Sequence, residues 1–170
     1  METAVDREMV AHLMEAAFAY WRSQGSPITT VRRVICELAF GSAESYDAEE
    51  LLRWVRERDG LVSQSTVYRT LSSLVEAGLL REVRGQNGRR CYLVAPAPEK
   101  GQEGHMVCQD CGKVFALPDP CLGLREGALA RRKGFDLRRL SLRMEVGCKE
   151  WRDSGKCDHR VEGERMREGA

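Results

Sequence analysis

The spacing of apolar residues changes near Gly78, and this change constrains the fold of the chain most strongly. Before it, apolar side chains recur every three to four residues in four segments, which predicts four short helices. After it, residues 79–83 and 89–94 alternate between apolar and polar and flank the turn-forming stretch Gly85–Gly88. Helices followed by a hairpin are the order of a winged helix-turn-helix. We therefore expect an α+β protein whose first domain, residues 1–94, has this fold.

Capping residues support the predicted helices. Asp47 and Glu50 form the pattern of a capping box at the start of the third helix, because each side chain can bond the backbone N–H of the other residue. Ser63 or Ser65 can cap the fourth helix. Gly78 suits the left-handed position that follows its end.

A second domain is predicted after a proline-containing linker at residues 95–104. The domain should span residues 105–160, and residues 161–170 resemble a disordered tail. The predicted elements are strands at 105–108, 114–117 and 140–146 and a helix from 119 to about 133.

The bulk composition sets limits on function. The net charge is +1, and residues 1–94 hold 12 basic against 13 acidic side chains, so any DNA binding needs a local basic face. No apolar run reaches the length of about 18 residues that a membrane span requires. The first residues do not read as a secretory signal, so we expect a cytoplasmic protein. In that reducing compartment the seven cysteines favour metal ligation or redox chemistry over disulfides.

Cys108 and Cys111 form a C-x-x-C motif followed by Gly112, which brings two thiolates within reach of one tetrahedral ion. Cys148 and Cys157 can complete a four-cysteine shell, which is typical of a closed, structural zinc site. Alternatives for the fourth ligand are Cys121, Asp158 and His159. A thioredoxin-like redox motif would need a strand-to-helix junction, whereas this motif lies between two predicted strands.

The start of the fourth predicted helix carries side chains that suit contacts with bases, namely Gln64, Ser65, Thr66, Tyr68 and Arg69. The same residues could instead form the solvated polar face of a core helix.

The strings STVYRTLSSLVEAGLL, HMVCQDCGKV and KGFDL, with the late cysteine pair, resemble the ferric uptake regulator family from about residue 10 to 157. The resemblance implies a dimeric repressor with a winged helix and a C-terminal α/β dimerisation domain. It implies that Tyr68 and Arg69 contact DNA and that Arg32 does so from the second helix. It also implies one structural zinc per chain on Cys108, Cys111, Cys148 and Cys157.

The chain departs from the family pattern at the regulatory metal site. His105 keeps its position, but Glu103 stands where a second histidine is expected. There is no histidine just before the third helix and no acid at the end of the wing. Ala116 and Leu140 replace two further expected ligands. We expect no regulatory metal site of the usual composition, and at most a weak one at Glu103 and His105.

These features predict a sequence-specific DNA-binding regulator, a repressor acting as a homodimer on a duplex operator, with no membrane partner. No nucleophile–base pair or open metal site indicates an enzyme. One alternative is a zinc-stabilised protein-interaction module that no longer reads DNA. Others are a thiol-responsive regulator using Cys91, Cys121 or the zinc thiolates, and control by another ligand such as haem.

Overall fold

The computed structural model describes residues 7–42, 44–58, 60–94, 102–117 and 121–155. The chain divides into two compact units: Met1–Arg84 with Arg89–Ala97, and Gly85–Gly88 with Pro98–Ala170. None of the described helices is long and apolar enough to cross a membrane.

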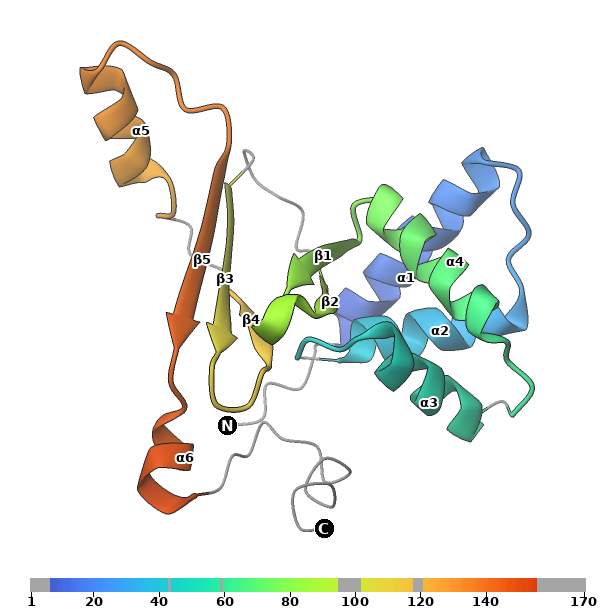
Figure 1. The fold of residues 1–170 in the computed structure, drawn as a ribbon. Coiled ribbons are helices and arrows are strands. Elements are labelled where there is room, and N and C mark those ends of the chain that lie inside the picture. Colours follow the sequence, from blue (N-terminus) through green and yellow to red (C-terminus); the bar gives the residue numbers. More distant parts are fainter. Residues whose placement is uncertain (1–6, 43, 59, 95–101, 118–120, 156–170) are drawn as a thin grey trace. The chain divides into compact units, whose positions relative to one another are not determined.

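The first unit contains four helices followed by a two-stranded hairpin (Figure 1). This order confirms the predicted winged helix-turn-helix. The helices are α1 (Arg7–Ser23), α2 (Thr30–Gly41), α3 (Ala48–Arg58) and α4 (Gln64–Glu76), and the hairpin strands are β1 (Leu80–Arg84) and β2 (Arg90–Val94). A single 3-10 turn, Gln86–Gly88, joins the two strands.

Helix α4 begins and ends where the capping residues predict. Ser63 is the N-cap, and its hydroxyl accepts a hydrogen bond from the Thr66 backbone N–H at 3.3 Å. Gly78 has φ +72°. The next backbone N–H, that of Leu79, donates to the Leu74 carbonyl, which closes the helix end.

The capping box at the start of α3 is also confirmed. The Glu50 backbone N–H donates to Asp47 Oδ1 at 2.7 Å, and the Asp47 N–H donates to Glu50 Oε2 at 2.9 Å. Both side chains are buried, so each satisfies a backbone donor that water does not reach.

A single apolar core joins the four helices. Trp21, Ile35, Phe40, Leu51 and Leu71 are almost completely buried in it. The Trp21 indole N–H donates to Ser73 Oγ at 2.6 Å, which connects α1 to α4. Burial of such side chains contributes most of the stability of the unit and sets the orientation of α4.

The hairpin is attached to the helices through the segment before α3. The backbones of Tyr46 and Tyr92 exchange two hydrogen bonds, of 2.8 and 3.3 Å. Their rings stack with centroids 6.3 Å apart, and Trp54 packs on the Tyr46 ring at 5.6 Å. Arg89 forms an ion pair with Asp47. Strand β2 is thus tied to the N-terminus of α3 by backbone, aromatic and ionic contacts.

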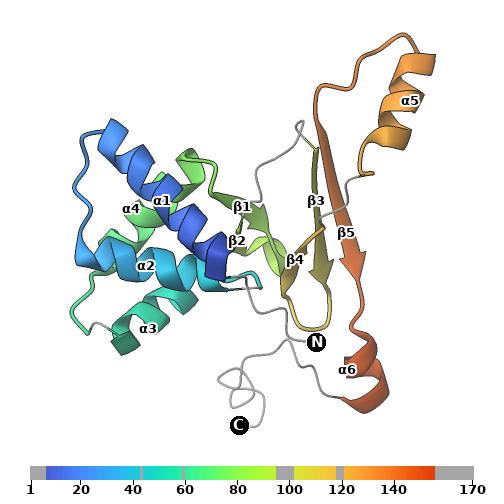
Figure 2. The same ribbon diagram turned by 180° about the vertical axis from the view of Figure 1, so that it is seen from behind.

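The second unit contains a three-stranded sheet of order β4-β3-β5 and two short helices (Figure 2). Strand β3 pairs antiparallel with β4 and parallel with β5. The elements are β3 (Gln102–Cys108), β4 (Val114–Ala116), α5 (Leu124–Arg132), β5 (Leu140–Val146) and α6 (Lys149–Ser154).

Two predicted boundaries in this unit are wrong. Residues 102–104, assigned to the linker, belong to β3, because parallel pairing with Leu140–Leu142 of β5 extends the strand. The helix predicted from residue 119 begins only at Leu124, since Gly123 has φ +88° and cannot continue a helix on its N-terminal side. Helix α6 was not predicted. The predicted tail, residues 161–170, lies outside the described residues.

Replacing Glu50 by alanine should lower the free energy of unfolding by about 1–3 kcal/mol, because it leaves the buried Asp47 N–H without its acceptor. The neighbouring Glu49 is exposed, and Glu49→Ala should change stability by less than about 0.5 kcal/mol. Urea unfolding followed by tryptophan fluorescence measures both, since Trp21 and Trp54 lie in this unit. Equal losses in the two variants would contradict the capping role.

Candidate DNA interface and cysteine cluster

Helix α4 has one face in the core and one polar face that is accessible. Its inward side chains, all buried, are Val67, Thr70, Leu71 and Leu74. On the other face Gln64, Ser65, Tyr68 and Arg69 are exposed, and Thr66 is half-buried. These five side chains occupy the first two turns, where a recognition helix meets base edges. The face is therefore a continuous polar surface on a rigid helix.

Arg32 is held by two contacts within the first unit. Its Nη1 donates to the Pro27 carbonyl at 2.7 Å, and its guanidinium lies 4.8 Å from the centre of the Trp21 ring. Arg33 stacks in the same way on Phe18, at 4.6 Å. The start of α2 thus carries two arginines whose charged groups are oriented by aromatic rings of α1.

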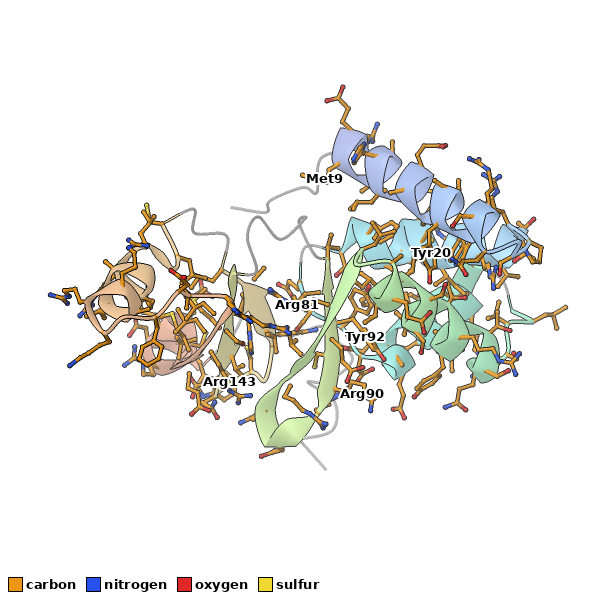
Figure 3. All side chains as sticks on the ribbon, turned by 90° about the horizontal axis from the view of Figure 1, so that it is seen from above. Met9, Tyr20, Arg81, Arg90, Tyr92 and Arg143 are labelled. Atoms are coloured by element: carbon orange, nitrogen blue, oxygen red, sulfur yellow. The ribbon has the colours of Figure 1, made fainter. Side chains whose placement is uncertain are left out.

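A cavity of about 290 Å³ lies beside Tyr68, between α3, α4 and the hairpin. Figure 3 shows Arg90 and Tyr92 on the hairpin that lines it. Burial, then the nearby Glu82 carboxylate, raises the pKa of Tyr92, so its phenol stays protonated. No local pattern in the sequence indicates this cavity, because its walls come from three separate elements. The lining residues are Asp47, Ala48, Glu49, Tyr68, Arg89, Arg90 and Tyr92.

The second unit brings three of the four predicted zinc ligands into one cluster. Cys108 and Cys148 are buried in the same cluster, and the partly buried Cys111 packs against it. Phe115, Val146 and Trp151 complete the apolar shell around the three sulfurs.

Hydrogen bonds donated by backbone N–H groups hold the two cysteine segments together. The C-x-x-C turn closes through Gly112 N–H to the Cys108 carbonyl at 3.0 Å, and Gly112 takes the φ of +74° that the turn requires. Gln109 N–H donates to the Val146 carbonyl at 2.8 Å. Cys148 N–H donates to Asp110 Oδ2 at 2.5 Å, so the turn is fixed to the junction of β5 and α6.

The predicted fourth ligand, Cys157, and its alternatives Asp158 and His159 lie outside the described residues. Within the described part of the chain, no three or more His, Cys, Asp or Glu side chains are positioned as a ready-made metal site. The donor chemistry nevertheless fits zinc, since Cys108, Cys111 and Cys148 belong to one apolar cluster and thiolates are typical zinc ligands.

The candidate regulatory site at His105 has poor neighbours. In the sheet, His105 lies between Ala116 of β4 and Arg143 of β5. Residues in register share one face of a sheet, so His105 adjoins the methyl group of Ala116 and the Arg143 side chain, neither of which ligates metal. The Arg143 guanidinium is paired with the Glu145 carboxylate at 3.2 Å. Glu103 lies in the same strand, and its side chain is outside the described part of the structure.

The remaining cysteines differ in accessibility. Cys36 is buried in the core, and burial raises the pKa of its thiol to about 12, so it stays protonated and unreactive. Cys91 is buried on β2, whereas Cys121 is exposed.

Comparison with known proteins assigns the chain to a family. Residues 23–145 match the model of the ferric uptake regulator family. A ferric uptake regulation protein of Campylobacter jejuni is 29% identical over 74% of this chain and 79% of its own length. A solved zinc-bound manganese uptake regulator is 29% identical, with a TM-score of 0.64 over 80% of this chain and 98% of its own.

The fold of the Helicobacter pylori ferric uptake regulator is also similar, with a TM-score of 0.73 at 24% identity over 86% of this chain and 96% of its own. The family match covers both units, from the end of α1 to β5, and so includes the polar face of α4 and the C-x-x-C turn. The chain therefore belongs to the ferric uptake regulator family of dimeric DNA-binding transcription regulators, and it is not an enzyme.

Proposed function

We propose that this protein is a zinc-containing repressor that binds a duplex operator through the exposed face of α4. The observation that carries the proposal is that face itself, with Gln64, Ser65, Thr66, Tyr68 and Arg69 on the first two turns of a helix fixed in the core. Arginine can bond guanine with two parallel hydrogen bonds, and the remaining groups suit base edges or phosphates. Arg32 contacts the DNA backbone from the start of α2.

The metal in this proposal is a structural zinc ion held by Cys108, Cys111, Cys148 and Cys157. The apolar cluster of the first three sulfurs supports it, as does the zinc-bound state of the similar manganese uptake regulator. Zinc bound by four thiolates cross-links the β3–β4 turn to the C-terminal segment. In a unit with few buried apolar side chains, such a cross-link contributes directly to folding.

A second copy of the chain is the proposed partner of the second unit. Strand β5 is at the edge of its sheet, so its outer backbone groups can pair with another strand. Large apolar side chains are exposed on α5, on β5 and in the segment between them. A nine-residue helix needs packing of its apolar side chains against another surface to be stable. The exposed side chains are Leu124, Leu129, Phe135 and Met144.

We further propose that DNA binding does not depend on a regulatory metal ion at Glu103 and His105. The position of His105 opposite Ala116 supports this, because a methyl group cannot ligate metal. Arg143, the neighbour of His105 on β5, offers no ligand either, and its charge is paired with Glu145. Control by thiol oxidation remains an alternative that uses Cys121, which is exposed, or the zinc thiolates, whereas Cys91 is buried.

Arg69→Ala should weaken operator binding by about 1–3 kcal/mol, roughly 5- to 150-fold, if Arg69 bonds a base with two hydrogen bonds. Arg69→Lys should retain binding to unrelated DNA but lose preference for the operator, because lysine keeps the charge without the planar fork. Ser72→Ala, exposed on the same helix one turn further on, is the control. Fluorescence anisotropy with operator and unrelated duplexes measures all three, and an unchanged operator affinity in Arg69→Ala would exclude its assigned role.

Elemental analysis of the purified protein should find about one zinc per chain, and Cys108→Ser should abolish it. Cys157→Ser, Cys121→Ser, Asp158→Ala and His159→Ala then decide the fourth ligand, since only the variant of a true ligand loses zinc. Loss of metal should also unfold the second unit, because metal binding and folding are coupled in small zinc sites. A metal-free chain with full secondary structure by circular dichroism is incompatible with this role.

Adding iron or manganese to the zinc-loaded protein should leave its operator affinity unchanged within about twofold. His105→Ala should behave in the same way, because no ion is bound there. A gain of tenfold or more with either metal, lost in His105→Ala, would overturn metal-independent control. If the wild-type protein binds no duplex at any salt concentration, the alternative of a zinc-stabilised protein-interaction module gains support.

A further inference from the structure

The hairpin places arginines together at the end nearest its turn. In the ladder of β1 and β2, Arg84 lies directly opposite Arg90, and Arg89 precedes Arg90 in the chain. Like charges at opposed positions on a hairpin are destabilising. Carboxylates already offset part of this repulsion, and an anionic partner that contacts this end of the hairpin can take their place.

The same face of the hairpin lies beside the recognition helix. Residues in register share a face, so Arg90, Glu82 and Tyr92 project together. Arg90 and Tyr92 also line the cavity of about 290 Å³ whose opposite wall includes Tyr68 of α4. An anion bound at the polar face of α4, near Tyr68, would therefore lie close to Arg89 and Arg90, which line the same cavity.

Both cavity-lining arginines are oriented by a carboxylate yet remain accessible. Arg90 Nε lies 3.1 Å from Glu82 Oε1, and Arg89 pairs with Asp47. The side chains of Arg90 and Arg89 are 57% and 53% exposed. The Arg90–Glu82 pair is accessible on both sides and is worth little in water, so a phosphate can replace the Glu82 carboxylate at small cost. The Asp47 side chain is only 10% exposed, so Arg89 keeps its pair with Asp47 and can contact a phosphate only through its remaining N–H groups. Glu82 is accessible, at 36%, and can return to solvent.

We propose that Arg90, assisted by Arg89, is a second DNA-contacting element that grips a backbone phosphate flanking the bases read by α4. The carboxylate of Glu82 holds the Arg90 guanidinium in position and competes with the phosphate for it. The inference rests on the proposed DNA binding by α4. To the contacts of α4 it adds a phosphate contact by Arg90 that does not depend on base sequence, and it identifies Glu82 as a side chain that limits the affinity for DNA.

Arg90 is the cleaner position for a test, because Asp47, the partner of Arg89, also caps α3. Arg90→Gln should reduce the slope of log K against log salt concentration by about 0.9 per lost phosphate contact, or about 1.8 for a dimer. The loss should be the same on operator and unrelated duplexes. Glu82→Gln should raise affinity by up to about fivefold per subunit, since it frees Arg90. A gain of affinity cannot result from misfolding.

The ion pair of Arg58 and Glu37 is a matched control. Its N–O distance is 3.0 Å, its side chains are 56% and 46% exposed, and neither residue lines the cavity. Arg58→Gln and Glu37→Gln should leave the salt slope unchanged. The double variant Arg90→Gln/Glu82→Gln should bind no more tightly than Arg90→Gln alone.

Salt titrations by fluorescence anisotropy decide the matter. Equal slopes for Arg90→Gln and wild type would overturn the phosphate contact. A gain from Glu82→Gln that persists in the Arg90→Gln background would overturn the competition. If the wild-type protein binds its operator, either of these results refutes only the role of Arg90 and Glu82. Absence of duplex binding by the wild type refutes the proposed function itself.

Discussion

The attachment of the hairpin to the start of α3 is the interaction on which the DNA-binding unit depends. Tyr46 shares backbone hydrogen bonds and a ring stack with Tyr92, and the next residue, Asp47, caps α3 and pairs with Arg89. Two consecutive residues thus connect the helical core to the wing. One oxygen of the Asp47 carboxylate caps α3 and the other pairs with Arg89, so this side chain fixes the hairpin relative to α3. Asp47 and Arg89, which form this connection, also line the cavity beside Tyr68.

The second unit is stabilised differently. Its buried residues are few, and the largest apolar side chains of α5 remain exposed. A small domain of this kind needs support from outside its own core. Converging cysteines and an open edge strand point to the two sources of that support, a metal ion and a second copy. In the proposed zinc site, a metal ion would take over part of the stabilising role that hydrophobic burial has in the first unit.

Much of the fold could be predicted because its signals are local. The capping box of Asp47 and Glu50, the Ser63 cap and the turn at Gly78 each depend on a few neighbouring residues, and each is confirmed. Of the two misplaced boundaries, the start of α5 is set locally by Gly123, whereas the start of β3 depends on a distant partner. Strand β3 is longer than predicted because β5, more than thirty residues away, pairs with it. Helix α6 is a single short segment whose position depends on the bond between Cys148 and Asp110.

By itself, the sequence determined the family and the type and order of the described elements except α6, and it predicts the residues that can ligate zinc. These follow from periodicity, from capping and from a motif whose spacing alone brings two thiolates together. Only the tertiary structure decided which polar side chains share a surface. The cavity joining Tyr68, Arg90 and Tyr92, and the placement of His105 between Ala116 and Arg143, arise from strand register and helix packing. Register depends on contacts between residues far apart in the chain, and no local pattern encodes it.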